Sequence, residues 1–317
     1  MEDGNTKGSD IFKNIRMGVG TWAWGDRLYW GYGREYHDDD LKNAFLVSVQ
    51  GGVRFFDTAE VYGQGQSESL LGNFLREFDG EFVVASKFMP FPWRLRKSSL
   101  LRALRKSLGR LGLEQLDLYQ THMPIPPITV EAWMDAMVEA YQAGLIRAVG
   151  VCNYNREQLH RAYESLARQG VPLASCQVEY SLLNREIEQN GIKQTCEELG
   201  ISIIAYSPLA QGLLSGKYTP EQPPRGIRGR QKNRNYLEQI KPLITEMRRI
   251  GADNAGKPPV QVALNWLIAR GAIPIPGAKN EEQALQNSET LAWSLSEEEI
   301  MKLDHVSAQL IRSDSKK

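Results

Sequence analysis

The chain of 317 residues contains 38 lysines and arginines and 38 aspartates and glutamates, so its formal net charge is zero. A balanced charge provides no overall field for holding nucleic acid or an anionic membrane, which excludes both as the main partner. Hydrophobic residues make up 42% of the chain and charged residues 24%, which is typical of a globular protein and excludes a disordered or fibrous one.

The amino terminus is polar and acidic. Residues 1–14 are expected to form a flexible tail, and they lack the apolar core of a secretory signal. No apolar run approaches membrane-spanning length. Cys152, Cys176 and Cys196 show no C-x-x-C spacing, which argues against a disulfide framework or a zinc site. These features predict a soluble cytoplasmic protein, or one from a plastid or another organelle if a transit peptide has been removed.

An unusual segment follows the first expected strand, Ile15–Thr21. Residues Trp22–Gly33 mix aromatic residues and glycines without a helical or strand period, which predicts a long loop that presents flat apolar rings. Gly18, Gly20 and Ala23 match the G-x-G-x-x-[GA] dinucleotide fingerprint. That motif must open a helix, and this segment is not helical, so we reject a Rossmann-type site here.

Further along, the chain alternates between β-prone apolar runs and helical periods. The remaining strands are expected at Val53–Asp57, Phe82–Ser86, Leu116–Thr121, Ala148–Cys152, Ala174–Val178, Ile201–Tyr206 and Ala272–Ile275. Helices are expected at Asp40–Gln50, from Ser67 onward, at Ser99–Arg110, Val130–Ala143, Arg156–Arg168, Ile187–Leu199 and Glu281–Leu291, and around Ile240–Met247 and Val260–Arg270. Ser296 and Glu299 form a capping box for one more helix. Eight β-then-α units predict an α/β fold, a (β/α)8 TIM barrel that forms a single domain over residues 15–317.

Four polar residues follow consecutive strands. Asp57 ends the second strand, Tyr62 lies in the loop after it, Lys87 follows the third strand and His122 the fourth. In a parallel barrel these strand ends share one rim, where catalytic residues gather. A tyrosine transfers protons poorly near neutral pH unless a cation stabilises its phenolate, and Lys87 would be that cation. Asp57 would hold Lys87 charged, and His122 could donate a hydrogen bond to a substrate oxygen.

Each of these four residues also has a structural alternative. Asp57 could be a turn or helix cap, and Tyr62 a packing residue. Lys87 could be a solvated cation, and His122 a structural histidine. Their joint placement at adjacent strand ends favours a protonation device that needs neither metal nor thiol.

Motifs along nearly the whole chain resemble the aldo-keto reductase superfamily. They run in the family's order from Gly18–Trp22 to Ile275–Asn280 and include Phe55–Gly63, Ala85–Lys87, Leu116–His122, Val149–Asn153, Gln177–Tyr180 and Ala205–Tyr218. The resemblance implies NADPH-dependent reduction of an aldehyde or ketone to an alcohol. It implies that Tyr62 donates the proton and that the catalytic tetrad is Asp57, Tyr62, Lys87 and His122.

The same resemblance implies a set of cofactor-binding residues. The nicotinamide would be held by Asn153, Gln177 and Tyr206, and the pyrophosphate by Ser207, Leu209, Gln211, Gly212, Leu214 and Lys217. The adenosine end would be surrounded by Lys279, Asn280, Gln283 and Asn287, and the set is completed by Gly20, Thr21, Trp22, Asp57 and Gly277. Lys279 favours NADPH, because a 2′-phosphate binds a cation. Cys152 stands where many relatives have serine and is a weaker hydrogen-bonding group, so carboxamide binding is expected to depend on Asn153 and Gln177.

The aromatic loop is expected to line the substrate pocket, with core packing as the alternative for each ring. The candidate substrate-binding residues are Trp22, Trp24, Tyr29, Trp30, Tyr62, Trp93 and His122. They suggest a planar aromatic aldehyde, and the loop Gly20–Asp26 is similar to that of pyridoxal reductases, which implies pyridoxal. A basic stretch is interpreted as a solvated loop, a flap over the cofactor phosphates or a site for a phosphate-bearing substrate; it comprises Arg225, Arg228, Arg230, Lys232 and Arg234.

Two other functions stay open. Some members of the superfamily attach to membrane channels as nucleotide-responsive subunits with slow turnover, so a regulatory or sensor subunit is the alternative to a reductase. A phosphate-binding barrel lyase or isomerase would use its last two loops for substrate phosphate. The sequence shows no obvious partner patch, so we expect a small-molecule carbonyl substrate and no obligate protein, nucleic-acid or membrane partner.

Overall fold

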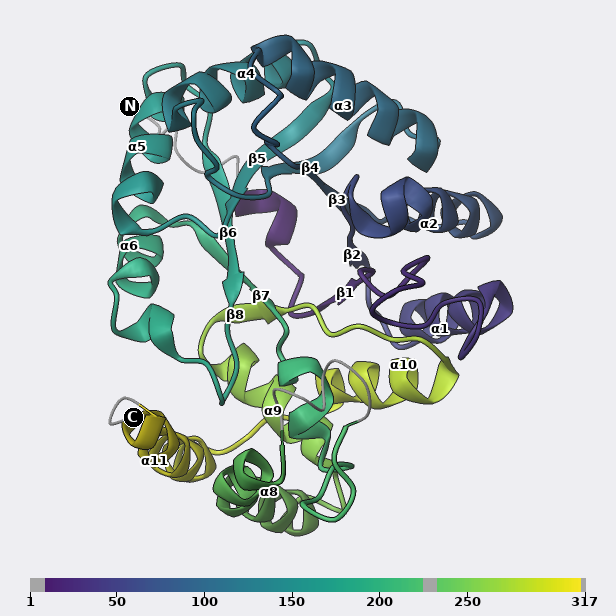
Figure 1. Ribbon diagram of the computed structural model, residues 1–317, viewed down its shortest axis with the longest axis vertical. Helices are drawn as coiled ribbons and strands as arrows, with labels where there is room; N and C mark the ends of the chain where they lie inside the picture. Colours follow the sequence, from purple (N-terminus) through teal and green to yellow (C-terminus); the bar gives the residue numbers. More distant parts are fainter. Residues whose placement is uncertain (1–8, 225–232, 315–317) are drawn as a thin grey trace.

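The computed structural model describes residues 9–224 and 233–314, and its centre is a sheet of eight parallel strands (Figure 1). Each strand pairs with the next along the chain. The strands are β1 (Gly18–Gly20), β2 (Phe55–Asp57), β3 (Val83–Phe88), β4 (Leu116–Thr121), β5 (Ile146–Cys152), β6 (Leu173–Glu179), β7 (Ser202–Tyr206) and β8 (Ala272–Pro274). The amide of Gly20 donates to the Pro276 carbonyl over 3.1 Å, which links β1 to the segment after β8. The sheet is therefore a nearly closed barrel, and the predicted fold class is confirmed.

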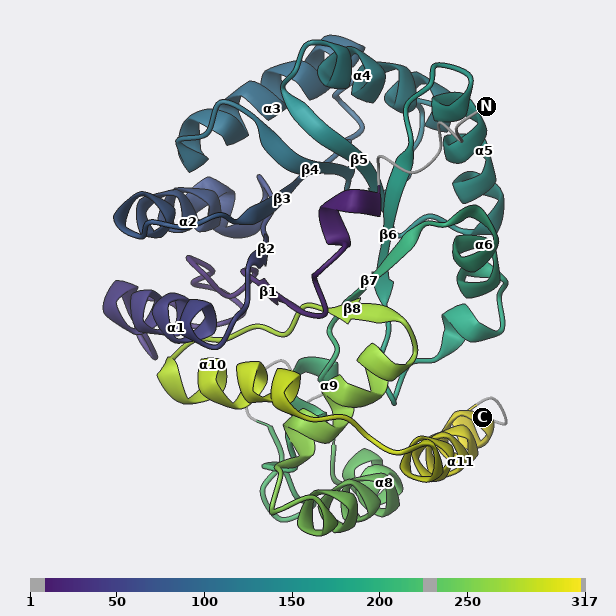
Figure 2. The same cartoon turned by 180° about the vertical axis from the view of Figure 1, so that it is seen from behind.

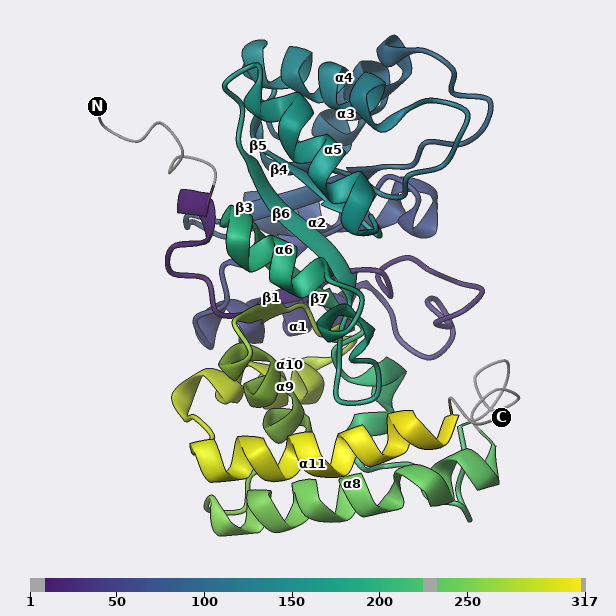
Figure 3. The same ribbon diagram turned by 90° about the vertical axis from the view of Figure 1, so that its left-hand side faces the viewer.

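Helices surround this barrel on its outer side (Figure 1). They are α1 (Asp38–Gln50), α2 (Gln66–Glu77), α3 (Lys97–Leu111), α4 (Val130–Gln142), α5 (Arg156–Ala167), α6 (Ile192–Leu199), α8 (Arg234–Asp253), α9 (Pro259–Ala269), α10 (Glu281–Ser288) and α11 (Glu297–Asp314). Neighbouring helices pack in chain order from α1 to α6, and α10 packs against both α9 and α1. α8 and α11 lie side by side outside this ring (Figure 3).

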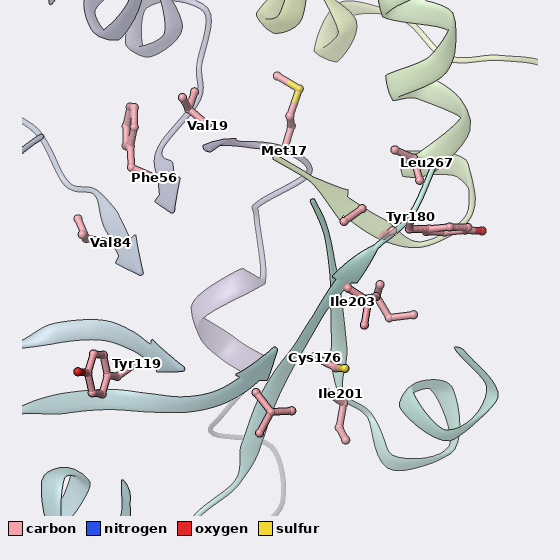
Figure 4. Close-up of a cluster of buried hydrophobic side chains, with 14 of the residues drawn as sticks. Met17, Val19, Phe56, Val84, Tyr119, Cys176, Tyr180, Ile201, Ile203 and Leu267 are labelled. Carbon is pink, nitrogen blue, oxygen red and sulfur yellow. The ribbon is translucent and has the colours of Figure 1, made fainter. Parts of the chain in front are cut away.

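The two faces of each strand have different neighbours, because successive side chains alternate across a strand. In β2, Phe56 points outward into the main hydrophobic cluster between strands and helices (Figure 4), whereas Phe55 belongs to a second cluster inside the barrel. Asp57 is the next inward position after Phe55. The same alternation in β3 and β4 makes the inward residues Ala85, Lys87, Leu118 and Gln120. Apolar side chains therefore fill the inside of the barrel, and polar ones follow toward the carboxyl ends of the strands.

The amino-terminal boundary differs from the prediction of a flexible tail over residues 1–14. Ser9–Phe12 form a 3-10 helix (η1) that lies at the end of the barrel opposite the long loops (Figures 2 and 3). The Phe12 ring is 6% exposed and contacts Phe55 edge-to-face, with the ring centroids 5.7 Å apart. Burial of a phenylalanine ring stabilises a fold by about 1.5–3 kcal/mol, which favours an ordered position for this segment. Residues 1–8 lie outside the described part of the chain.

Smaller differences concern the helices. The helix expected over Ile187–Leu199 is divided, because a short 3-10 turn (η3, Glu186–Glu188) is separated from α6 by Gly191 at a φ of 85°. The capping box before α11 is confirmed, since Ser296 Oγ accepts from the Glu299 amide and Glu299 Oε2 accepts from the Ser296 amide. After Gly20 the chain turns instead of opening a helix, which agrees with the rejection of a Rossmann fingerprint. Across residues 9–224 and 233–314, no helix is long and apolar enough to cross a membrane.

Candidate active site

Asp57 and Lys87 form a buried ion pair at the carboxyl ends of β2 and β3. Their side chains are 1% and 0% exposed, and Lys87 Nζ lies 2.5 Å from Asp57 Oδ2. The ammonium also donates to the Thr58 carbonyl over 2.9 Å and to the Tyr62 hydroxyl over 3.3 Å. All three of its donors are therefore used, which fixes its position between the carboxylate and the phenol.

Tyr62 reaches Lys87 from the loop after β2. It begins a 3-10 turn (η2, Tyr62–Gly65) in which Gly63 and Gln64 have left-handed backbone angles. Its ring lies 4.9 Å below Lys87 Nζ and meets the His122 ring edge-to-face at 5.8 Å between centroids. The structure thus brings together all four residues of the predicted tetrad, although their catalytic roles stay predictions.

The electrostatics of the site keep Tyr62 protonated and Lys87 charged. Burial raises the pKa of Tyr62 to about 12, against the opposing effect of Lys87. Burial, the largest single effect, would lower the pKa of Lys87, but the combined attraction of Asp57, Tyr62 and Cys152 raises that pKa above its ordinary value. Burial, together with the Lys87 charge, lowers the pKa of His122 to about 3. At neutral pH the site therefore contains a neutral phenol, a neutral imidazole and an ammonium.

The residues expected to hold the nicotinamide lie directly beside this group. Gln177 donates its amide to Asp57 Oδ1 over 2.8 Å. Asn153, at a φ of 59°, donates to the His122 carbonyl over 3.2 Å and accepts from the Tyr206 hydroxyl over 2.9 Å. These contacts join β2, β5, β6 and β7 into one surface that ends in the half-buried Tyr206 ring.

The loop after β7 has an unusual backbone. Left-handed angles occur at Ser207 (50°), Ala210 (47°), Gln211 (57°) and Gly212 (93°). Such conformations are costly for residues other than glycine and orient amides into concave anion sites, so the loop fits a pyrophosphate. Lys217 is exposed nearby, with its ammonium 4.9 Å over the Tyr218 ring. Leu214 has a side chain that is 0% exposed and an amide that donates to the Leu209 carbonyl, and its contact with the pyrophosphate stays a prediction.

The segment after β8 is shaped by its own side chains. Gln283 accepts from the Lys279 amide over 3.0 Å, and Asn287 donates to the Gly277 carbonyl over 3.3 Å. The Lys279 ammonium lies 3.7 Å from Glu35 and 4.6 Å over the Tyr36 ring. The segment therefore presents one cation, in a setting that suits an anionic group such as a 2′-phosphate.

Two residues expected at the cofactor also have structural contacts. Thr21 is fully buried, and its hydroxyl contacts the Asp57 carbonyl and Ser67 Oγ. Gly20 lies so close to the segment after β8 that a Cβ there would come within 2.8 Å of the Ile275 carbonyl oxygen. Glycine is therefore required at residue 20 for closure of the barrel.

The predicted aromatic pocket is only partly assembled. Trp22 stacks on Tyr29 at 5.2 Å, and Trp30 meets Trp22 edge-to-face at 5.5 Å. Trp22 also lies 6.4 Å from the Tyr62 ring, and Tyr29 donates to Gln211 Oε1 over 2.8 Å. These three rings therefore connect the tetrad to the loop after β7.

The other two tryptophans do not join this group. Trp24 is 0% exposed, packs on Phe74 of α2 and donates its indole N–H to the Ala278 carbonyl over 2.9 Å. It belongs to the core, which corrects its assignment to the pocket. Trp93 is 73% exposed and stacks on Phe91 at 4.6 Å, so it lies on the surface of the β3–α3 loop. Of the basic stretch, residues 225–232 lie outside the described part of the chain.

Sequence reasoning missed Gln120, whose amide donates to Asp57 Oδ1 over 3.2 Å. The signal was its position two residues before His122, on the inner face of β4. Cys152 is 1% exposed and burial raises the pKa of its thiol to about 12, which agrees with a packing role. Asn153 Nδ2 lies 3.2 Å from its sulfur.

Comparison with known proteins identifies the family. The aldo/keto reductase family matches residues 16–308 of this chain. The chain belongs to the aldo/keto reductase family. It is 42% identical over 310 residues to the chloroplastic pyridoxal reductase of Arabidopsis thaliana, and the alignment covers 94% of this chain and 84% of that protein.

Solved structures agree with this assignment. The glycerol dehydrogenase of Gluconobacter oxydans superimposes with a TM-score of 0.81 and 27% identity, covering 93% of this chain and 92% of its own. An aldo/keto reductase of Klebsiella pneumoniae in complex with NADP and acetate gives a TM-score of 0.71 and 28% identity, and the superposition covers 92% of this chain and 91% of that one. The chain is accordingly an NADP-dependent oxidoreductase that reduces carbonyl groups of small molecules. This replaces the alternative of a phosphate-binding lyase or isomerase.

Proposed function

We propose that this enzyme reduces planar aromatic aldehydes, with pyridoxal as the first candidate, and that Tyr62 supplies the proton. The observation that carries the substrate class is the stack of Trp22 on Tyr29 beside Tyr62, with Trp30 at its edge. Flat indole and phenol rings favour flat ligands through offset and edge-to-face contacts. The 42% identity to a pyridoxal reductase supports the same class.

The proposed roles follow from the protonation states. Bound NADPH supplies a hydride to the carbonyl carbon. Tyr62 donates its hydroxyl proton to the carbonyl oxygen, so that the carbon gains a C–H bond, the oxygen gains an O–H bond and the product is an alcohol. Lys87 stabilises the phenolate left on Tyr62, and Asp57 keeps Lys87 in place. The neutral His122 can donate one hydrogen bond to the carbonyl oxygen and orient it.

The cofactor is proposed to extend from Tyr206 to Lys279. Asn153 and Gln177 offer side-chain amides for the carboxamide, and the left-handed loop after β7 offers amides for the pyrophosphate. Lys279 would exchange its contact with Glu35 for a contact with the 2′-phosphate. This exchange favours NADPH over NADH, because NADH has no anion at that position.

The test is turnover on a defined panel. The quench of tryptophan fluorescence on titration with NADPH and NADH measures cofactor affinity, and the decrease in NADPH absorbance then follows pyridoxal, substituted benzaldehydes and small aliphatic aldehydes. We expect tighter binding of NADPH than of NADH, and many turnovers with kcat/KM highest for the planar aldehydes. A preference for aliphatic aldehydes would overturn the substrate class. Binding followed by a single slow turnover would instead favour the regulatory or sensor subunit.

A further inference from the structure

We propose that Gln120 is a positioning residue for the proton-transfer group: its side-chain amide holds Asp57 in the orientation in which the carboxylate supports Lys87. This inference rests on the proposed function, since Asp57 and Lys87 act on the reaction only through Tyr62. Gln120 is not proposed to touch the substrate. It acts on proton transfer only through the Asp57 carboxylate.

The two oxygens of the Asp57 carboxylate have separate partners. Oδ2 accepts only from the Lys87 ammonium, at 2.5 Å, among the hydrogen bonds of the described residues. Oδ1 accepts from the amide of Gln177 at 2.8 Å and from the amide of Gln120 at 3.2 Å. A buried carboxylate needs several donors, and charge-assisted bonds to one oxygen fix the plane of the group. The two amides therefore set the direction in which Oδ2 faces Lys87.

The strand registers explain how Gln120 reaches this carboxylate. Gln120 of β4 is paired with Lys87 of β3 and with Gly150 of β5, so the three lie at one level of the barrel. A Cβ at Gly150 would come within 2.9 Å of Gln120 Cγ. The glycine thus leaves room for the amide to cross the inner side of β3 and meet Asp57 of β2. Gln120 is itself 0% exposed, and its side chain points into the barrel toward this group.

Loss of this donor has a specific electrostatic consequence. In the wild-type site the amide of Gln120 draws part of the carboxylate charge to Oδ1. Without it, the charge of Asp57 acts more strongly on its surroundings and the carboxylate can rotate away from Lys87. Asp57 opposes the ionisation of Tyr62, so the stronger effect of its charge moves that ionisation to higher pH, whereas rotation of the carboxylate leaves Lys87 less firmly placed and lowers the rate. The titratable groups that face Tyr62 are Asp57, Lys87, His122, Cys152 and Tyr206, and the substitution leaves all of them in place.

The experiment compares Gln120→Met, which keeps the length of the side chain without the donor, with the wild-type enzyme. Ser175→Ala is the matched control, because Ser175 is a buried polar residue beside Gly150 whose hydroxyl has no hydrogen-bond partner among the described residues. The readouts are NADPH affinity by fluorescence, thermal unfolding, and the pH profiles of aldehyde reduction and of alcohol oxidation with NADP. Turnover by the wild-type enzyme is established first, so that failure of the proposed function is recognised separately.

For Gln120→Met we expect NADPH affinity within about threefold of wild type and kcat lower by about tenfold, in line with one hydrogen bond to a charged group. The rising limb of alcohol oxidation, along which Tyr62 ionises and becomes able to accept the alcohol proton, should move upward by about half a pH unit or more. Ser175→Ala should keep the wild-type profile. The proposal is overturned if the rising limb of alcohol oxidation is unchanged in Gln120→Met. It is also overturned if a change in NADPH affinity or in thermal unfolding accounts for the loss of kcat. If Gln120→Met does not fold, Gln120→Asn, whose shorter amide falls short of Asp57, must show the same shift, and an unchanged profile there is equally decisive against it.

Discussion

Replacement of Lys87 by methionine removes the cation from the centre of the site while an unbranched side chain is kept. The ammonium lies 3.3 Å from the Tyr62 hydroxyl, and Coulomb attraction over that distance at an effective dielectric constant of about 20 is about 5 kcal/mol. A single hydrogen bond to a charged group is worth about 2 kcal/mol. The two values bound the expected loss of kcat between about 30-fold and several thousandfold, since 1.36 kcal/mol is a factor of ten in rate.

The same substitution leaves the Asp57 carboxylate buried without its cation. Breaking a buried ion pair on one side costs about 3–5 kcal/mol, so Lys87→Met should also lower the unfolding temperature. The double substitution Lys87→Met with Asp57→Asn removes both charges and should restore most of that stability. Because it restores no cation beside Tyr62, it should not restore kcat.

The assay measures kcat for pyridoxal at saturating NADPH and thermal unfolding for wild type and both variants. Separation of the two properties is the decisive result: stability that recovers in the double variant while kcat stays low. The reasoning is refuted if kcat recovers together with stability, because Lys87 would then serve only the fold. It is also refuted if Lys87→Met loses less than about threefold in kcat, well below the bound set by one hydrogen bond.

Three further predictions concern separate parts of the molecule. The pKa of His122 is lowered from 6.5 to about 3, so the folded state resists protonation of this residue. The contribution of the neutral His122 to stability should be complete above about pH 6.5 and fall toward pH 3. In thermal unfolding, a His122→Gln variant should lose less stability over that pH range than the wild type. Phe12→Ala should cost about 3–5 kcal/mol of unfolding free energy in urea titration, whereas Lys13→Ala, at an exposed neighbour, should cost almost nothing; equal values would refute the packing role of η1. Trp22→Leu should raise KM for aromatic aldehydes by about tenfold and spare aliphatic ones, whereas Trp93→Leu should change neither, and equal effects in steady-state kinetics would contradict the pocket.

The barrel could be predicted from the sequence because each strand carries its own signal. In Phe55–Phe56–Asp57 an inward ring, an outward ring and an inward carboxylate follow one another, and the same alternation recurs in the next two strands. Position at a strand end was therefore enough to bring Asp57, Lys87 and His122 to one rim. The division of the helix expected over Ile187–Leu199 into η3 and α6 was harder to predict from the sequence, because it depends on the left-handed conformation of Gly191.

The assignments that failed depend on contacts between distant segments. Trp22 and Trp24 stand in the same glycine-rich loop, but Trp24 is fixed in the core by a hydrogen bond to Ala278, 254 residues away. Phe12 is buried in the cluster inside the barrel, where its ring contacts Phe55, 43 residues further along the chain. Gln120 could have been noticed as an inward polar residue of a buried strand, although its bond to Asp57 requires the strand registers.

The central claim is that Tyr62 donates the proton, and Tyr62→Phe tests it most directly. Phenylalanine keeps the ring contacts with Trp22 and His122 and removes only the hydroxyl. The measurement is kcat for pyridoxal at neutral pH, together with NADPH affinity by tryptophan fluorescence. We predict an unchanged affinity and a kcat lower by about 10² to 10⁴-fold, the range of general acid catalysis. A variant that binds NADPH normally and keeps kcat within about threefold of wild type would contradict the account, since another group would then supply the proton.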